Sequence, residues 1–311
     1  MTAIKATGLR RSYGDHVVLK GVDLNVQRGT VFSLLGANGA GKTTTVKILS
    51  TLIGADGGSA SVAGHDVASD PVAVRAAIGV TGQFSAVDNL LTGRENLKLM
   101  ADLNHLGRTD GKRKVEQLLE QFDIADAADK PAASYSGGMR RRLDLAMTLV
   151  GSPQVIFLDE PTTGLDPRSR RAMWDIVRRL VASGVTIFLT TQYLDEADEL
   201  ADRIAVLDHG KIVAEGTADE LKRRIPGGHV LLQFSDPRHL EAATRVVRNA
   251  SRDGEALALR VPNDGSVGAL KALLDRLDEH SVLVDSLSMH TPDLDDVFLA
   301  LTGKPETVAH S

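Results

Sequence analysis

A glycine-rich segment of eight residues constrains the fold of this chain more than any other feature of its sequence. It runs from Gly36 to Thr43 and reads Gly-Ala-Asn-Gly-Ala-Gly-Lys-Thr. An apolar run suited to a buried strand, 31–35, precedes it, and a helix-like run, 44–49, follows it. The order of strand, glycine loop and helix is the setting in which such a loop binds a polyphosphate.

The chemistry of the loop supports phosphate binding. Residues without a Cβ atom let successive backbone N–H groups point inward, and the helix start adds the positive end of its dipole. Lys42 would bridge the β- and γ-phosphates, and the hydroxyl of Thr43 would hold Mg²⁺. Taken alone, the pattern also permits a glycine-rich surface turn.

Composition places the chain among globular proteins. Its length of 311 residues is enough for one large core and a small second domain. A composition of 42% hydrophobic and 25% charged residues is ordinary for such a protein. A net charge of −5 argues against a phosphate-led grip on nucleic acid as the main activity. No apolar stretch approaches the ~20 residues that span a bilayer, and no signal-peptide pattern is present, so we expect a cytosolic chain. The lack of cysteine removes disulfides, thiol catalysis and cysteine-ligated zinc from consideration.

Hydrophobic patterns predict an α/β fold. Short apolar bursts separated by turns over 4–35 predict an antiparallel strand layer before the loop. Further along, buried strands alternate with helices, which predicts a wound parallel sheet. Its strands are expected at 78–81, 155–158, 185–190 and 203–207, and a helical block at about 89–150 is expected to contain helices at 94–106, 111–122 and 137–150.

Candidate site residues stand next to these strands. Asp159 and Glu160 follow the strand at 155–158, at the carboxyl end where α/β sheets place their ligands. Asp159 would help to fix Mg²⁺ through its water shell, and Glu160 could polarise the attacking water. Each candidate also has a structural interpretation: an exposed acidic turn for this pair, a polar strand cap for Gln83, and a half-buried hairpin residue for Tyr13, which could otherwise stack on a nucleobase.

A second glycine pair opens the helix expected at 137–150. Ser136 can cap that helix, but Gly137 and Gly138 in its first turn weaken it by about 1 kcal/mol each relative to alanine. Bare backbone N–H groups at a helix start form an anion site, so phosphate could bind here as well. The arginines at 140–142 are expected to lie mostly toward solvent.

Together these motifs resemble the ATP-binding subunit of an ABC transporter over about residues 3–222. The match runs in chain order: Tyr13 as the adenine-stacking aromatic, Gly36 to Thr43 as Walker A, Gln83 as the Q-loop glutamine, Ser136-Gly137-Gly138 within the signature, Asp159 at the end of Walker B with Glu160 next, and Asp166 as the D-loop aspartate. Because the whole set occurs in order, the resemblance favours the functional interpretation of each residue.

The resemblance implies a head-to-tail homodimer that closes around two MgATP molecules. Each ATP would be held by one subunit and capped by Ser136 and Gly138 of its partner. The nucleotide contacts that it implies are Tyr13, Gly36, Ala37, Asn38, Gly39, Ala40, Gly41, Lys42, Thr43, Thr44, Ser136, Gly137, Gly138 and Asp166. It implies Thr43, Gln83 and Asp159 as Mg²⁺ ligands, and Lys42, Gln83, Glu160 and Gln192 as the catalytic set.

Three runs, 135–142, 190–194 and 294–302, resemble the daunorubicin/doxorubicin-resistance type of drug exporter. This type implies efflux of a hydrophobic drug, antibiotic or lipid through a separate polytopic permease, from the cytoplasmic face of the membrane. A helical subdomain at about 84–150 would meet the permease, with Gln83 as the hinge. The alternative is a soluble ABC ATPase that acts on ribosomes or DNA, but such proteins usually carry two motif sets or a long coiled-coil insertion, and neither is present.

The sequence departs from the usual motifs at two positions. Met139 stands where most signatures have glutamine, and Gln192 stands where most of these ATPases place a switch histidine that contacts the γ-phosphate. Gln192 can donate a hydrogen bond but cannot become a cation near neutral pH. The resemblance therefore leaves Glu160 as the expected base.

Composition changes after a linker at 223–228. Strands and helices alternate over 229–302, which predicts a small α+β domain behind an ATPase domain at 1–224. We interpret it as a packing or dimer-contact domain rather than as a drug or ligand sensor. The end of the chain, 303–311, is expected to be a flexible tail.

Overall fold

The computed structural model describes residues 1–82, 86–224, 228–247, 249–252, 256–263, 266–290 and 292–303. Contacts between Cα atoms divide the chain into two compact units, Met1–Ala218 and Asp219–Ser311. The division falls at the start of the short helix α8 (Ala218–Lys222), whereas the sequence pattern placed it after Arg224. The expectations for Gln83, for the middle of the linker and for the tail beyond Gly303 lie outside the described residues.

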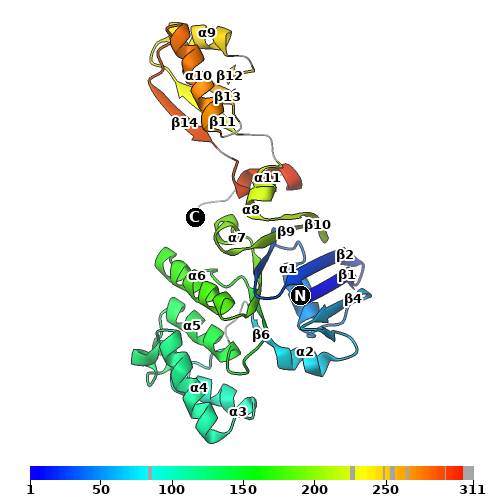
Figure 1. Cartoon of the computed structure of the whole chain (residues 1–311). Helices are drawn as coiled ribbons and strands as arrows, with labels where there is room; N and C mark the ends of the chain where they lie inside the picture. The colour runs from blue at the N-terminus through cyan, green and yellow to red at the C-terminus, as the bar shows by residue number, and fades with distance from the viewer. Residues whose placement is uncertain are drawn as a thin grey trace. The chain divides into compact units, whose positions relative to one another are not determined.

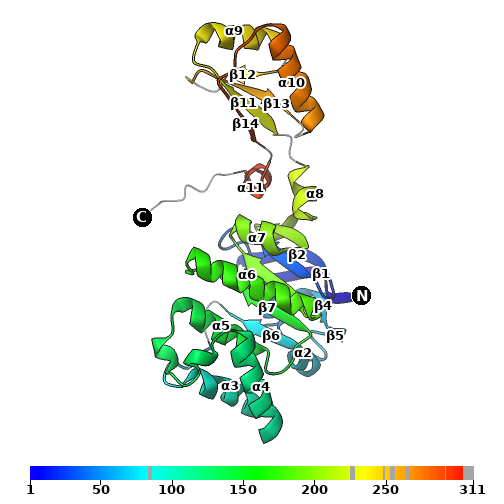
Figure 2. The ribbon, with the colours of Figure 1, turned by 60° about the vertical axis from the view of Figure 1, so that its left-hand side comes forward.

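A six-stranded sheet forms the centre of the first unit, with the strand order β10-β9-β3-β8-β7-β6 (Figures 1 and 2). Its neighbouring strands are parallel except for β10 and β9. The strands are β3 (Val31–Leu35), β6 (Ile78–Thr81), β7 (Val155–Asp159), β8 (Thr186–Thr191), β9 (Arg203–Asp208) and β10 (Lys211–Gly216). The predicted wound parallel sheet is confirmed, and its parallel strands end at one common edge.

Both faces of this sheet are buried, as its continuous apolar runs require. Along β7, Val155 and Phe157 enter one hydrophobic core, whereas Ile156 and Leu158 enter another. The first core also contains side chains of α1 (Lys42–Leu49) and of the antiparallel layer. The second contains side chains of the helical subdomain and of α6 (Pro167–Ala182). Because neither face is free, polar chemistry is confined to the ends of the strands.

An antiparallel sheet of order β2-β1-β4-β5 packs on the first core. Its elements are β1 (Thr2–Tyr13), β2 (His16–Gln27), β4 (Gly57–Val62) and β5 (His65–Asp66), and α2 (Pro71–Ala77) follows them. The antiparallel layer is confirmed, but β1 and β2 are long strands rather than short bursts. Their pairing shifts register at several bulges, which interrupt the apolar alternation without ending the strands.

The helical subdomain consists of α3 (Gly93–Leu103), α4 (Arg108–Gln121) and α5 (Gly137–Thr148), with short 3₁₀ turns at Ala125–Ala127 and Ala132–Ser134. The three predicted helices are confirmed, with shifted ends. Helix α3 begins at a capping box, in which the Thr92 hydroxyl accepts from the Glu95 N–H at 3.1 Å and the Glu95 carboxylate accepts from the Thr92 N–H at 2.8 Å. Buried leucines of these helices pack in the second core.

The second unit is a small α+β fold, as the sequence predicts. Its antiparallel sheet has the order β12-β13-β11-β14, with β11 (His229–Gln233), β12 (Ser251–Arg252), β13 (Ala258–Pro262) and β14 (Ser286–His290). Three helices follow or connect these strands: α9 (Pro237–Val246), α10 (Val267–Glu279) and α11 (Leu294–Thr302). Side chains of α9 and α10 share one hydrophobic core with the strands.

We expect Phe188 to be a principal stabilising residue of the first unit. Its ring lies fully buried on β8, with ring centroids 5.7 Å from Phe32 and 5.5 Å from Phe157. Phe188→Ala should lower the free energy of unfolding by about 3–5 kcal/mol, because it leaves a cavity between the sheet and the antiparallel layer. Urea unfolding of the full chain measures this loss. The control is Leu52→Ala, whose side chain is 65% exposed, and a similar loss in both variants would contradict the prediction.

Candidate functional site

The glycine loop joins the end of β3 to α1 and borders a cavity of about 310 Å³. The cavity is lined by the loop, the start of α1, the strand β2 and the residue after β7. The lining residues are His16, Val18, Asn38, Gly39, Gly41, Lys42, Thr43, Thr44 and Glu160. Of these, His16 and Val18 were not indicated by the motifs. The sequence feature that could have indicated them is the predicted hairpin, because His16 pairs with Tyr13 across it.

Two positions of the loop have room only for glycine. A Cβ atom on Gly36 would lie 2.4 Å from the carbonyl oxygen of Leu207 on β9. A Cβ atom on Gly41 would lie 2.7 Å from Leu19 Cδ2 on β2, and the φ angle of Gly41 is 113°, which disfavours residues other than glycine. These glycines therefore serve close packing of the loop against its neighbours as well as access to its N–H groups.

The ammonium group of Lys42 is buried between the loop carbonyls and Glu160. Its Nζ donates to the carbonyl oxygens of Gly36 at 2.8 Å and Ala37 at 3.1 Å, and it lies 3.3 Å from Glu160 Oε1. Burial lowers the pKa of Lys42, whereas the charges of Glu160 and Asp159 oppose that shift. A polyphosphate in the cavity would meet a hydrogen-bond donor whose charged form the carboxylates favour.

Oxygen donors suited to Mg²⁺ meet where β7 ends. Thr43 Oγ1 donates to Asp159 Oδ2 at 2.9 Å, and the hydroxyl of Thr190 donates to Asp159 Oδ1. Mg²⁺ prefers hard oxygen ligands and is commonly held by one or two carboxylates together with substrate phosphates. One hydroxyl and one carboxylate would leave the rest of a Mg²⁺ shell to phosphate oxygens and water. The described residues contain no group of three or more His, Cys, Asp or Glu side chains that could hold a metal ion.

Glu160 occupies a strained position at the cavity. Its φ angle is 51°, a left-handed conformation that is uncommon outside glycine, and its N–H donates to the carbonyl oxygen of Thr190 at 3.0 Å. The residue is 8% exposed, and its carboxylate lines the cavity. The structure therefore places a carboxylate, a lysine ammonium and a hydroxyl–carboxylate pair at one edge of the sheet.

The second glycine pair lies elsewhere on the first unit. The Ser136 hydroxyl accepts from the Met139 N–H at 3.2 Å and caps α5, and none of Ser136, Gly137 and Gly138 lines the cavity. A Cβ atom on Gly138 would lie 2.6 Å from Ser169 Oγ, so this glycine has a packing reason within its own chain. Around Gly137 the space is open, with the nearest atom, Leu165 Cδ2, at 3.9 Å from such a Cβ.

Three further predicted residues, Tyr13, Gln192 and Asp166, do not line the cavity. Tyr13 ends β1 with 47% of its surface exposed, and the guanidinium carbon of Arg11 lies 5.1 Å from its ring centroid. Gln192 is half-buried just after β8. Asp166 caps α6 by accepting from the N–H groups of Arg168 and Ser169, and hydrogen bonds to Ser169 lower its pKa. Gln83 lies outside the described residues.

The arginines at 140–142 are not a solvated face, and that prediction was wrong. The side chain of Arg141 is 11% exposed and that of Arg142 is 20% exposed, and both bind backbone carbonyl groups. The prediction failed because α5 packs against β6, α3, α4 and α6, so its polar face contacts other protein elements rather than water. Local periodicity does not reveal how many neighbours a helix will have.

Glu196 is a further residue whose role the sequence patterns did not indicate. It lies on α7 (Leu194–Leu200) without exposed surface and accepts from Thr162 Oγ1 at 2.8 Å and from Trp174 Nε1 at 3.2 Å. Burial raises its pKa. The helical face shared with Ala197 and Leu200 is the signal that could have identified it. Because Thr162 stands two residues after Glu160, Glu196 supports the turn that carries the cavity carboxylate.

Comparison with known proteins decides the family. Residues 19–163 match the ABC transporter family. The chain is 49% identical to the daunorubicin resistance ATP-binding protein DrrA2 of Streptomyces coeruleorubidus, over 97% of this chain and 95% of that protein. This chain belongs to the ATP-binding subunits of ABC transporters. It is also 44% identical to the doxorubicin resistance ATP-binding protein DrrA of Mycobacterium tuberculosis (strain ATCC 25618 / H37Rv), over 99% of this chain and 96% of that protein.

Solved structures of ABC transporter cassettes have the same fold. An ATP-binding subunit of an ABC transporter aligns with a TM-score of 0.64 at 29% identity, covering 71% of this chain and 92% of its own. An ATP-binding cassette in its ADP conformation aligns with a TM-score of 0.64 at 25% identity, with the same coverage. The chain is therefore an ATPase that uses ATP and Mg²⁺.

Subunits of this family work with separate membrane permease components. Within the described residues, no helix of this ATPase has both the length and the apolar character needed to cross a bilayer.

Glu196 should make the stability of the ATPase depend on pH. Burial raises its pKa from 4.5, so the folded state keeps a proton that the unfolded chain has already released. The resulting stabilisation is complete below pH 4.5 and is lost as pH rises through the raised pKa. Glu196→Gln keeps the acceptor oxygen but does not titrate, so its free energy of unfolding should fall less over this range. Urea unfolding at a series of pH values compares the two proteins, and parallel curves would contradict the prediction.

Proposed function

We propose that this ATPase drives export of a hydrophobic drug, antibiotic or lipid through a separate polytopic permease. Its support is the near-complete alignment with relatives named for daunorubicin or doxorubicin resistance. A further relative is the Nod factor export ATP-binding protein I of Ralstonia nicotianae, which is 36% identical over 97% of this chain and 94% of that protein. The transported molecule would bind to the permease, and the ATPase would act as a peripheral subunit at the cytoplasmic face of the cell membrane.

The open space at Gly137 carries the proposal of a head-to-tail homodimer. A glycine in the first turn of a helix costs about 1 kcal/mol relative to alanine, and no neighbour among the described residues requires one there. Bare N–H groups at a helix start bind anions, so a phosphate brought by a second subunit would account for this glycine. The signature residues do not line the cavity of their own chain. Each subunit would thus supply one half of two shared sites.

The proposed chemistry is in-line attack of water on the γ-phosphate of ATP. Glu160 takes a proton from the water as its oxygen bonds to phosphorus and the bond to the ADP oxygen breaks. Lys42 and the N–H groups at the start of α1 neutralise the charge on the phosphoryl group, and Gln192 donates a hydrogen bond to it. Mg²⁺, when held by Thr43 and Asp159, offsets phosphate charge. Loss of the γ-phosphate removes the bridging charge, and the subunits separate.

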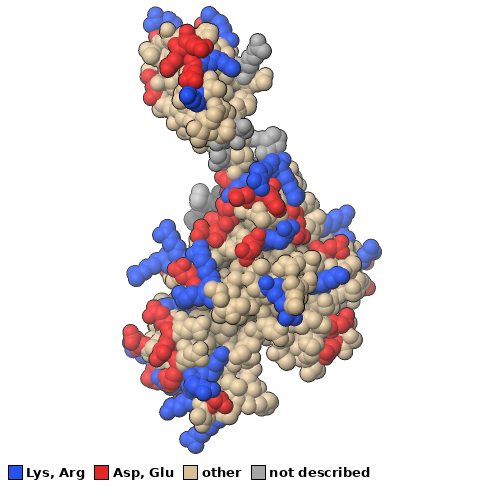
Figure 3. Space-filling view, viewed as in Figure 1, with Lys and Arg blue, Asp and Glu red and all other residues tan. Residues whose placement is uncertain are grey.

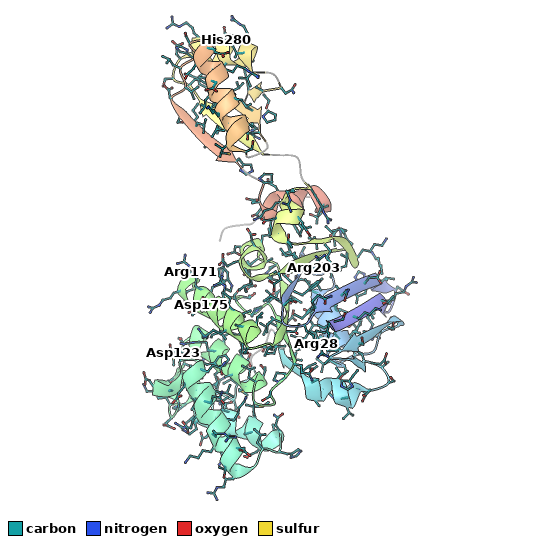
Figure 4. All side chains as sticks on the ribbon, in the orientation of Figure 1. Arg28, Asp123, Arg171, Asp175, Arg203 and His280 are labelled. Carbon is teal, nitrogen blue, oxygen red and sulfur yellow. The ribbon has the colours of Figure 1, made fainter. Side chains whose placement is uncertain are left out.

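Glu160→Gln should abolish turnover and trap an ATP-bound dimer. Glutamine keeps the size of the side chain but cannot accept the proton, and removal of a general base lowers rates by about 10²- to 10⁴-fold. Phosphate release measures turnover, and light scattering with saturating MgATP measures the dimer. Asp175→Asn on the outer side of α6, labelled in Figure 4, makes the same charge change away from the cavity and serves as the control. Undiminished turnover would remove Glu160 as the base, and monomers alone would contradict the dimer.

Transport through a partner should be measurable in membranes. A tagged chain isolated from its own host should bring down a polytopic membrane protein. Inverted vesicles with both proteins should take up doxorubicin when ATP is present, and vesicles with Glu160→Gln should not. Recovery of ribosomal RNA or DNA instead would favour a soluble ABC ATPase. On the face shown in Figure 3, basic and acidic side chains are interspersed, which does not suit a surface that binds nucleic acid.

We further propose that the small α+β domain at 229–302 is a packing or dimer-contact domain. Its own core is small and is formed by side chains of β11, β13, α9 and α10. The described residues of this unit contain no group of acidic, histidine or cysteine side chains that could hold a metal. Such a unit would add contact surface to the dimer rather than chemistry to the site.

A further inference from the structure

Arg141 lies between the helix α5 and the turn that carries Glu160. Its Nε donates to the carbonyl oxygen of Pro161 at 2.9 Å, and its Nη2 donates to the carbonyl oxygen of Asp159 at 3.4 Å. These two carbonyl groups flank Glu160 in the chain. One planar guanidinium therefore holds the backbone on both sides of the cavity carboxylate.

The same guanidinium reaches the neighbouring strand β6 and an acidic partner. Arg141 Nη1 donates to the carbonyl oxygen of Gly82 at 2.9 Å and to Asp144 Oδ2 at 3.2 Å. Asp144 is 3% exposed, and its Oδ1 accepts from the N–H of Ala86 at 3.0 Å. Since Arg141 and Asp144 stand one turn apart on α5, this buried ion pair connects the helix to both strand ends.

The backbone at Glu160 is the kind that needs such support. Left-handed residues other than glycine cost of order 1–3 kcal/mol and persist only where the surrounding structure determines their conformation. A rigid guanidinium with several donors holds carbonyl groups in a defined geometry, which an ammonium group cannot do. Within α5, Arg142 makes different contacts, to the carbonyl groups of Phe122 and Asp123.

We propose that Arg141, paired with Asp144, is a positioning residue that holds Glu160 in place and ties its position to α5. Helix α5 begins at Ser136, the residue proposed to cap the ATP of the partner subunit. Movement at that end of α5 would reach Glu160 of the same subunit through Arg141. The pair thereby links the two half-sites of one chain. This inference rests on the proposed role of Glu160 as the base.

The test uses a double variant that removes both buried charges together. Arg141→Gln alone would take the guanidinium away from the carboxylate of Asp144, whereas Arg141→Gln with Asp144→Asn removes both charges. The double variant should stay folded by circular dichroism and keep its affinity for a fluorescent ATP analogue, although loss of the bonds to three carbonyl groups should lower its thermal unfolding temperature. Its kcat should fall by about 10- to 100-fold, because a displaced base acts poorly even when substrate binds normally. The single variant Arg141→Lys keeps the charge but loses the planar group, so its kcat should also be lower than that of the unaltered ATPase.

The matched control is Arg142→Gln with Asp123→Asn, which removes an ion pair of 3.0 Å between the neighbouring arginine of α5 and Asp123. Figure 4 labels Asp123 at the outer edge of the helical subdomain. This control should keep kcat within about twofold of the unaltered ATPase. Full kcat in the Arg141 and Asp144 double variant, or an equal loss in the control, would overturn the inference. If Glu160→Gln itself kept turnover, the base assignment would fail instead, so the two failures are distinguishable.

Discussion

Burial of the central sheet on both faces is the constraint on which the rest of this structure depends. Strands that are apolar on both sides leave room for polar groups only where they end. The parallel strands β3, β6, β7 and β8 end at the same edge. The residues that follow β3 and β7 directly are Gly36 and Glu160, so the glycine loop and the carboxylate become neighbours although they are far apart in sequence.

At that edge the buried charges and hydroxyl groups satisfy one another. Asp159 accepts from Thr43 and Thr190, which joins α1, β7 and β8, and Lys42 faces Glu160 at 3.3 Å. An isolated charge in such surroundings would be unstable, whereas charges of opposite sign that contact one another can be buried together. In the proposed site, a nucleotide phosphate would add negative charge beside Lys42, and Mg²⁺ would add positive charge beside Asp159. The two ligands would then balance each other's charge.

Helix α5 combines packing contacts within its own chain with a proposed contact to a partner subunit. Its first turn contains Gly138, which packs closely against Ser169, and Gly137, for which no neighbour in the described part of the chain requires a glycine. One turn further, Arg141 binds the carbonyl groups on both sides of Glu160. A helix that would face a partner subunit at its first turn, as proposed, and that holds the turn of Glu160 with its flank is suited to couple two sites. Rigid helices carry such coupling better than loops, because their residues cannot move independently.

The sequence by itself determined the strand–loop–helix order, the parallel sheet, the helical subdomain and the identity of the loop, because these follow from local periodicity and from motif spacing. It did not determine which polar side chains are buried. The helical pattern placed Arg141 toward solvent, no pattern marked Glu196 as buried, and Gly138 resembled an anion site alone. Only the tertiary structure decided these cases, since burial depends on which elements pack against a helix, and that is set by segments distant in the chain.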